Sequence, residues 1–280
     1  MISFTIDLED PTEAYEPEGR YAASTRHILD LCDEYRCRAT FFTVGRIAER
    51  SPTLIRDIAS RGHEIGYHSR NHVPLTKEDP ERFRDEAKRD KARLEELAGK
   101  SVNGFRAPAF SLTQKTLWAV DVLKEIGFAY SSSIMPTWVS RYGFPGAPRT
   151  PFRWPNGLIE LPLPVGTLGP LTLPYLGGIY MFSTSFWLVK MFARQAGAGE
   201  ILWTYAHPYD FDKDERFIVR LHGSVLASSI LWMARGVAEK KIRKVLDLGV
   251  GPPLGSRIQS VGMDCIYTPP APGPDQISAA

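Results

Sequence analysis

Short apolar, β-branched or aromatic runs alternate along this chain with stretches of helical periodicity, and this alternation limits the fold more than any other feature. It is typical of parallel strands joined by crossover helices. A chain of 280 residues also has a suitable length for one α/β barrel with an appendage. The strand-like runs are "ISFTID", "RATFFTVG", "HEIGYHS", "VNGFRAP", "FAYSSSI", "LIELPL" and "EILWTYAHP".

Helical patterns fill the spaces between these runs. The first is expected around Ala22 to Tyr35, and "PTLIRDIASRG" has Pro52 in its first turn and Gly62 at its end. Further helices are expected in "DPERFRDEAKRDKARLEELAGK", "TQKTLWAVDVLKEIG" and "STSFWLVKMFARQAGAG". The apolar stretch "LPLPVGTLGPLTLPYLGGIYMF" is interrupted by Pro and Gly, so it is interpreted as loop and strand and not as a membrane span.

The pattern changes after Asp212, where a long amphipathic helical stretch begins. We therefore expect a catalytic domain over residues 1–212 and a helical extension with a disordered tail over residues 213–280. The glycine-rich "VLDLGVGPPLG" resembles a nucleotide-binding loop. Two prolines remove backbone donors that such a loop needs, so the segment is interpreted as a helix stop and a turn.

Composition restricts the partners and the compartment. The chain is 43% hydrophobic and 24% charged, and its net charge of +2 does not indicate a nucleic-acid partner. The three cysteines do not have the spacing of a zinc motif, and their odd number does not fit a full set of disulfides. The sequence also does not begin with a pattern typical of a secretion signal. A cytoplasmic protein is therefore expected. The basic cluster "EKKIRK" predicts either peripheral contact of the C-terminal helix with the inner membrane face or packing of that helix on the barrel.

Ionisable residues follow at least four of the predicted strands, at the end where barrel enzymes collect their functional side chains. The sequence "HSRNH" puts His68 and His72 four residues apart. Two imidazoles plus one carboxylate are donors that a divalent ion such as zinc prefers. The alternative is a pair of hydrogen-bonded surface histidines. The other residues at strand ends are Asp7, Glu9, Asp10, Arg106 and His207.

Four motifs in this order resemble the polysaccharide deacetylases, the family with the nodulation-protein-B homology domain (carbohydrate esterase family 4). They are "TIDLED", "HSRNH", "FRAPAF" and "WTYAHP", and the resemblance covers roughly residues 1–212. The segments "YSSSIMP" and "GGIYMFSTSFWL" further resemble a bacterial subgroup linked to exopolysaccharide assembly. This resemblance implies a distorted or incomplete (β/α) barrel and metal-dependent removal of N-acetyl groups from amino sugars.

The resemblance also implies residue roles. Asp7 would be the general base, Arg106 its partner and His207 the general acid, whereas Asp10, His68 and His72 would hold the metal. Zinc is favoured as the metal, with Co²⁺, Mn²⁺ and Ni²⁺ as alternatives. Pro108 and Phe110 would contact the substrate, an N-acetylated polysaccharide or lipid-linked oligosaccharide, and a backbone N–H near Ala109 or Phe110 would stabilise the oxyanion.

Two departures from the family pattern leave alternatives open. Most members have adjacent aspartates in the first motif, but here Leu8 and Glu9 separate Asp7 from Asp10, so Glu9 competes with Asp10 as the carboxylate ligand. Ser131 stands where the subgroup commonly has an acidic residue. Hydrolysis of a non-sugar amide and non-catalytic carbohydrate binding are the competing functions. The sequence does not indicate the sugar, the linkage or the oligomeric state.

Overall fold

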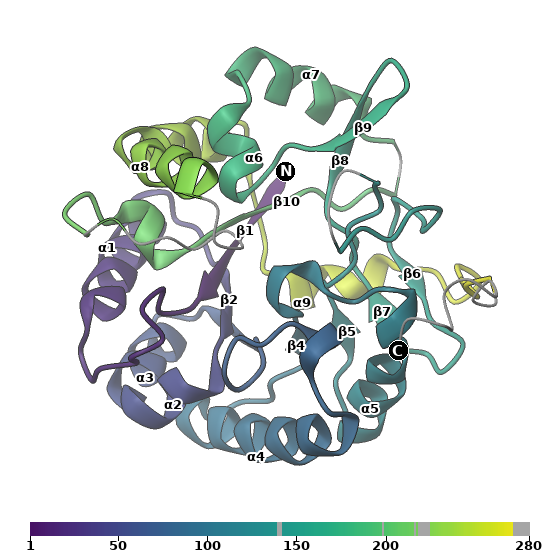
Figure 1. Cartoon of the computed structure of the whole chain (residues 1–280), viewed down its shortest axis with the longest axis horizontal. Helices are drawn as coiled ribbons and strands as arrows, with labels where there is room; N and C mark the ends of the chain where they lie inside the picture. The colour runs from purple at the N-terminus through teal and green to yellow at the C-terminus, as the bar shows by residue number, and fades with distance from the viewer. Residues whose placement is uncertain (139–141, 198, 216, 218–224, 271–280) are drawn as a thin grey trace.

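The computed structural model describes residues 1–270 apart from 139–141, 198, 216 and 218–224. In the described part of the chain, nine strands form one curled sheet in the order β10-β1-β2-β3-β4-β5-β7-β6, with β11 also paired to β1. The strands from β10 to β7 run parallel, and β6 is antiparallel to β7. The sheet does not close on itself, and Figure 1 shows helices α1 to α5 around its outside. This architecture confirms the predicted incomplete (β/α) barrel.

The elements follow the predicted alternation. The strands of the sheet are β1 (Ile2–Leu8), β2 (Thr40–Thr43), β3 (Glu64–Tyr67), β4 (Gly104–Phe105), β5 (Tyr130–Ser131), β6 (Phe152–Arg153), β7 (Ile159–Glu160), β10 (Trp203–Ala206) and β11 (Val250–Gly251). The surrounding helices are α1 (Arg20–Glu34), α2 (Gly45–Arg50), α3 (Pro52–Ser60), α4 (Pro80–Ala98) and α5 (Trp118–Ile126). Short 3₁₀ turns lie at Leu75–Lys77, Gln114–Thr116, Ile258–Ser260, Pro108–Phe110 (η2) and Pro208–Phe211 (η4).

Local sequence explains where several helices begin and end. The Asp79 side chain accepts a hydrogen bond from the Arg82 N–H at the start of α4, and Gly99 at its end has the left-handed conformation that ends many helices. At the end of α1, Arg36 has a φ of 50° and the Cys37 N–H donates to the Cys32 carbonyl at 2.7 Å. This hydrogen bond turns the chain from α1 into β2.

The parallel strands divide their side chains between two cores. Phe4, Ile6 and Leu8 of β1 belong to the larger core outside the sheet, under the helices. A smaller core fills the inside of the curled sheet and is rich in aromatic residues, including Phe42, Phe110 and Trp203. Polar residues of β1 also face this inner side, because side chains alternate between the two faces of a strand.

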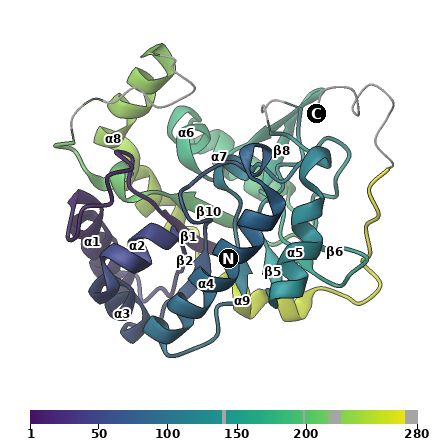
Figure 2. The same cartoon turned by 60° about the horizontal axis from the view of Figure 1, so that its bottom comes forward.

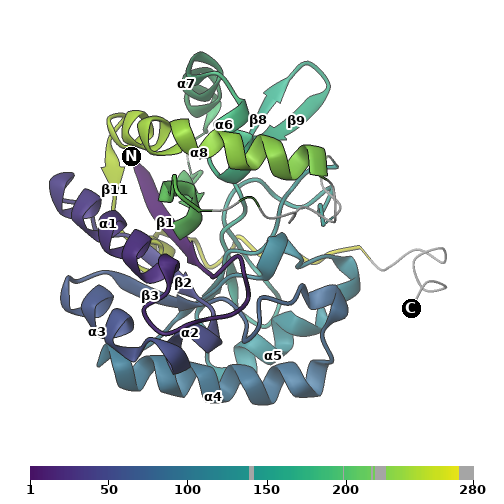
Figure 3. The ribbon, with the colours of Figure 1, turned by 60° about the vertical axis from the view of Figure 1, so that its left-hand side comes forward.

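A second group of elements covers one side of the barrel. It comprises the hairpin of β8 (Val165–Leu168) and β9 (Leu171–Pro174) together with α6 (Gly178–Ser183), α7 (Phe186–Gln195) and α8 (Val225–Leu246). Figure 3 shows these elements together on the side opposite α4. The hairpin confirms the interpretation of this apolar segment as loop and strand, but the end of the segment forms the helix α6, which was not predicted. In the part of the chain that the structure describes, no helix combines the length and the apolarity needed to cross a bilayer.

The C-terminal segment differs from its prediction. The predicted helix stop and turn are both present, because α8 ends at Leu246 and a turn follows at Asp247 and Leu248, but the chain then forms β11, which pairs with Ile2 and Ser3 of β1. The chain continues into α9 (Leu254–Arg257), which lies at the lower end of the barrel in Figure 2. The pairing of β11 was not predicted, because a partner strand 248 residues away in the sequence leaves no local signal. The predicted division at Asp212 stays a prediction, and the tail after Pro270 lies outside the described residues.

Candidate metal centre and active site

Asp7 and Glu9 lie on the same side of the chain at the end of β1. Side chains alternate along a strand, so residues two apart share a face, and both carboxylates are buried. Asp10 points elsewhere. Its carboxylate accepts hydrogen bonds from the Thr12 N–H at 2.9 Å, the Thr12 hydroxyl at 2.8 Å and the Tyr15 N–H at 2.8 Å. These bonds shape the loop that follows β1.

His68 and His72 meet Glu9 at the end of β3. One possible ligand atom from each of the three side chains lies within 4.8 Å of the others. Ser69 and His72 both have left-handed backbone conformations, with φ of 59° and 56°, and this tight path returns the chain so that the imidazole centroids are 5.0 Å apart. The three residues therefore form a compact group on two neighbouring segments.

The hydrogen bond of His68 determines which ring nitrogen is free to bind a metal. Its Nδ1 lies 2.8 Å from the Arg106 carbonyl, which can only accept, so Nδ1 carries the proton. The Nε2 lone pair is then available to a cation. Burial lowers the pKa of His68 to about 4, which favours the neutral form that a metal requires.

Glu9 and His72 form an ion pair. Burial would raise the pKa of Glu9, but the neighbouring histidines, chiefly His72, hold it well below its ordinary value. Burial would likewise lower the pKa of His72, and Glu9 instead raises it. One anionic oxygen donor and two imidazole nitrogens form a donor set that fits a divalent cation such as zinc.

Asp7 is held by a buried arginine beside this group. The Arg106 Nη1 donates to Asp7 Oδ1 at 2.6 Å and to the Thr5 hydroxyl at 2.8 Å. The guanidinium carbon lies 4.1 Å from the centroid of the Phe42 ring and 4.3 Å from that of Trp203. Arg106 is fully buried in contact with both rings, which limit the movement of its guanidinium, and Arg106 in turn holds Asp7.

His207 reaches the same region from the end of β10. Its Nδ1 donates to Asp210 Oδ2 at 3.0 Å, and its Nε2 lies 3.9 Å from Glu9 Oε1. The ring stacks on Tyr209 at a centroid distance of 4.6 Å. Burial would lower the pKa of His207, but the Asp210 carboxylate raises it to about 9. His207 is therefore protonated near neutral pH, as a general acid must be.

Pro108 and Phe110 follow Arg106 in η2, and both are buried. Phe110 packs on Tyr205 at a centroid distance of 5.1 Å, within the inner core. Ala109 and Phe110 have left-handed φ values of 54° and 55°, an uncommon backbone conformation for such residues. The Phe110 N–H donates to the Ala107 carbonyl at 3.0 Å.

The structure thus brings together Asp7, His68, His72, Arg106 and His207, as expected, and brings Glu9 in place of Asp10. The spacing of Asp7 and Glu9 was the available signal, because both fall on the polar face of a strand whose apolar face is Phe4, Ile6 and Leu8. Asp210 had no role in the sequence analysis. Its signal was the three-residue spacing from His207 across Pro208, which is typical of a capped turn.

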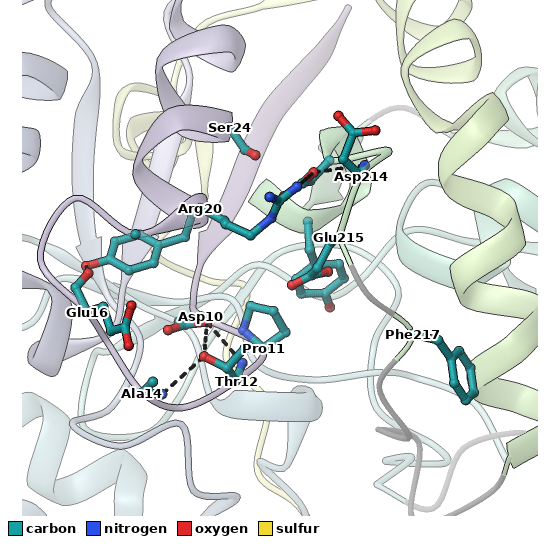
Figure 4. A pocket seen from close by; sticks show the side chains of 14 residues that line it. Asp10, Pro11, Thr12, Ala14, Glu16, Arg20, Ser24, Asp214, Glu215 and Phe217 are labelled. Atoms are coloured by element: carbon teal, nitrogen blue, oxygen red, sulfur yellow. Dashed lines mark hydrogen bonds and ion pairs between the residues drawn. The ribbon is translucent and has the colours of Figure 1, made fainter.

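A cavity of about 530 Å³ opens beside the site, on the side of Asp10. It lies between the loop after β1 and the segment around Tyr209 to Phe217, and Figure 4 shows Asp10, Arg20, Asp214 and Glu215 around it. Arg20 is paired with Asp212 across the cavity, at 2.5 Å. The three residues of the metal-binding group do not line this cavity.

Comparisons with known proteins identify two consecutive regions. Residues 6–131 match the family model described as "Polysaccharide deacetylase", and residues 132–248 match "Domain of unknown function (DUF3473)". The boundary between the two matches falls at residue 131, whereas the sequence analysis divided the chain at Asp212.

Curated relatives match part of this chain. A peptidoglycan-N-acetylglucosamine deacetylase of Bacillus cereus is 33% identical over 98 residues, which are 35% of this chain and 36% of that protein. A chitooligosaccharide deacetylase of Sinorhizobium fredii is 35% identical over 109 residues, which are 38% of this chain and 47% of that protein. The chain therefore spans less than half the length of these two relatives.

One solved structure is similar over nearly the whole length. It is the crystal structure of a Mycobacterium smegmatis protein assigned to the polysaccharide deacetylases, with a TM-score of 0.62, 23% identity and coverage of 97% of this chain and 94% of that chain. At this identity the likeness shows the fold. The match over residues 6–131 shows that this part of the chain is a domain of the polysaccharide deacetylase family.

Proposed function

We propose that this protein is a metal-dependent hydrolase that removes N-acetyl groups from the amino sugars of a polysaccharide or a lipid-linked oligosaccharide. The observation that carries the proposal is the meeting of Glu9, His68 and His72 beside the buried pair of Asp7 and Arg106. The relatives named above, which are deacetylases of N-acetylated glycans, support the substrate class.

Glu9, His68 and His72 would hold the cation, with zinc favoured over Co²⁺, Mn²⁺ and Ni²⁺ for this donor set. When bound, such a cation polarises an acetyl carbonyl and lowers the pKa of water near it. Glu9 replaces Asp10 as the proposed carboxylate ligand, because the Asp10 carboxylate is occupied by Thr12 and Tyr15.

The remaining steps belong to side chains of this chain. Asp7 accepts the proton of the attacking water, with Arg106 holding one carboxylate oxygen so that the other faces the substrate. His207, protonated and oriented by Asp210, donates a proton to the departing amine. The Ala109 N–H is the proposed oxyanion donor of the two considered, since the Phe110 N–H is already bonded to Ala107.

The decisive experiment measures acetate release from N-acetylglucosamine oligomers and peptidoglycan fragments with each of the four metal ions. Asp7→Asn should lower kcat by about 10²- to 10⁴-fold, because it removes the base. Its bound metal, measured by elemental analysis, should stay equimolar. Release of ammonia or another acid from non-sugar amides, without acetate from glycans, would favour the other amide hydrolases. Bound metal and bound glycan without turnover would favour a binding protein.

Three finer expectations stay proposals. They are a role in exopolysaccharide biosynthesis, a cytoplasmic location and contact of α8 with the inner membrane face. Co-sedimentation with anionic vesicles tests the last one, and replacing the exposed Lys240 and Lys244 by Glu should then weaken vesicle binding.

A further inference from the structure

Glu160 is a fully buried carboxylate that the proposed reaction does not use. It lies in β7, and its Oε1 accepts hydrogen bonds from the Ser133 N–H at 2.6 Å and the Ile134 N–H at 3.0 Å. A carboxylate is costly to bury, so a specific set of donors around it indicates a specific task.

The segment that Glu160 binds is the one that holds Arg106. The Arg106 Nε donates to the Ser132 carbonyl at 3.2 Å, and its Nη2 donates to the Ser132 hydroxyl at 3.1 Å. The Ser133 hydroxyl accepts from the Ala107 N–H at 2.8 Å, next to Arg106 in the chain, and from the Ser131 hydroxyl at 2.7 Å. Residues 131–133 therefore hold both the Arg106 guanidinium and the backbone of the next residue, Ala107.

Regular strand pairing ends within this segment, where the Ser132 N–H still donates to the Phe105 carbonyl of β4 at 2.9 Å. β5 ends at Ser131, so the two backbone N–H groups that follow Ser132 are bonded to the Glu160 side chain and not to a neighbouring strand. Without that acceptor, the segment would have to turn toward other partners, because buried N–H groups are costly to leave unpaired. The Ser132 acceptors would move with it.

We propose that Glu160 is a positioning residue that sets the direction of the Arg106 guanidinium and, through Arg106, that of Asp7. The guanidinium is a rigid planar fork, so the loss of acceptors at Nε and Nη2 also turns Nη1 away from Asp7. The effect on catalysis rests on the proposed function, whereas the effect on Arg106 does not.

The test follows the Arg106 Nε–H directly by ¹H–¹⁵N NMR, with its signal assigned by the Arg106→Lys variant. In the parent protein this buried, bonded N–H should exchange slowly with solvent. Glu160→Ala should speed its exchange at least about tenfold and lower kcat about 10- to 100-fold, with KM and bound metal within about twofold. Glu160→Gln should have the slow Arg106 Nε–H exchange and the kcat of the parent protein, because its amide oxygen still accepts from the two backbone N–H groups.

Glu64→Ala is the matched control. The Glu64 carboxylate accepts from the Tyr130 hydroxyl at 2.9 Å, the Thr40 hydroxyl at 2.7 Å and the Gly255 N–H at 2.9 Å, at the other end of the same sheet. Its removal should lower stability without changing the Arg106 signal or kcat. If Glu160→Ala does not fold, Glu160→Asp serves instead, since its shorter side chain withdraws the acceptor but retains the charge.

The outcomes separate this inference from the proposed function. Unchanged Arg106 exchange in folded Glu160→Ala or Glu160→Asp overturns the positioning role, whatever the activity. The role is also overturned if Glu64→Ala lowers kcat and speeds the exchange of the Arg106 Nε–H as much as Glu160→Ala does. Both effects would then come from general destabilisation. A parent protein without acetate release but with the expected exchange pattern leaves the positioning role supported and defeats only the deacetylase proposal.

Discussion

The two ends of β3 each carry a buried histidine, and the two imidazoles have opposite uses. His63 precedes the strand and His68 follows it, and burial lowers the pKa of each to about 4. The Ala39 N–H donates to His63 Nδ1 at 3.0 Å, which places the His63 proton on Nε2. His68 instead donates from Nδ1 to a carbonyl, which leaves its Nε2 free for a cation.

The two ends of the whole parallel sheet differ in the same way as the two ends of β3. At the end where the parallel strands finish, the side chains of Asp7, Glu9, His68 and His207 converge. At the opposite end the C-terminal segment covers the strands, where the Leu254 N–H donates to the Thr40 hydroxyl at 2.9 Å and β11 pairs with β1. We call the end of the sheet that carries Asp7, Glu9, His68 and His207 the chemical end, and the end covered by β11 and α9 the stability end. In (β/α) barrels, functional residues collect at the first of these ends and residues that stabilise the fold at the second.

The largest expected effect is at the chemical end, where Glu9→Ala and Asp10→Ala should behave differently. Glu9→Ala removes a ligand, so metal affinity should fall at least about 100-fold and acetate release about 10³-fold. Asp10→Ala should keep its metal and lose about 1 kcal/mol of stability through its loop hydrogen bonds. Elemental analysis measures the bound metal of both variants, and thermal unfolding measures their stability. Loss of metal from Asp10→Ala alone would reverse the ligand assignment.

His63 should make stability depend on pH. Its folded pKa of about 4 lies below the ordinary 6.5, so between these values only the unfolded chain takes up the proton. Stability should therefore fall as pH drops from 6.5 to about 4, by up to about 3 kcal/mol at about 1.4 kcal/mol per pKa unit.

The matched variant is His63→Asn, whose side-chain oxygen can still accept from Ala39. Denaturant unfolding of both proteins over this pH range should show the weaker pH dependence in the variant. Equal slopes would mean that His63 is not the group responsible, since all other titrating residues are shared.

A smaller effect is expected from Asp210→Asn at the chemical end. Without the carboxylate, the pKa of His207 should fall from about 9, so less of the protonated acid remains as pH rises. We expect kcat about tenfold lower at pH 8 and a smaller difference at pH 6. A pH profile of kcat measures this, and a difference that is constant with pH would exclude His207 as the acid.

The smallest effect is expected from Arg38→Ala at the stability end. Arg38 pairs with Asp33 at 3.4 Å, and both side chains are about half exposed. Such a pair contributes little, so unfolding stability at neutral pH should change by less than about 0.5 kcal/mol. A loss above about 1 kcal/mol would show that this surface is more tightly coupled to the core than its exposure indicates.

Much of the fold was predictable because strands and helices have their own periods. The runs around Phe41, Ile65 and Trp203 became strands of a parallel sheet, and Pro80 and Gly99 bound the helix expected between them. The antiparallel β6 and the pairing of β11 were not predictable. Each lies in a short segment bounded by Pro or Gly and outside any longer apolar run, and the partner of β11 is distant in the sequence.

The candidate site divides in the same way. The sequence by itself determined that Asp7, His68, Arg106 and His207 would lie at or just after the ends of strands, because strand ends are local features and parallel strands finish at one edge. Only the tertiary structure decided that Glu9 and not Asp10 faces the imidazoles. It also decided that Glu160 supports Arg106, because register and strand order bring together residues that no local pattern relates.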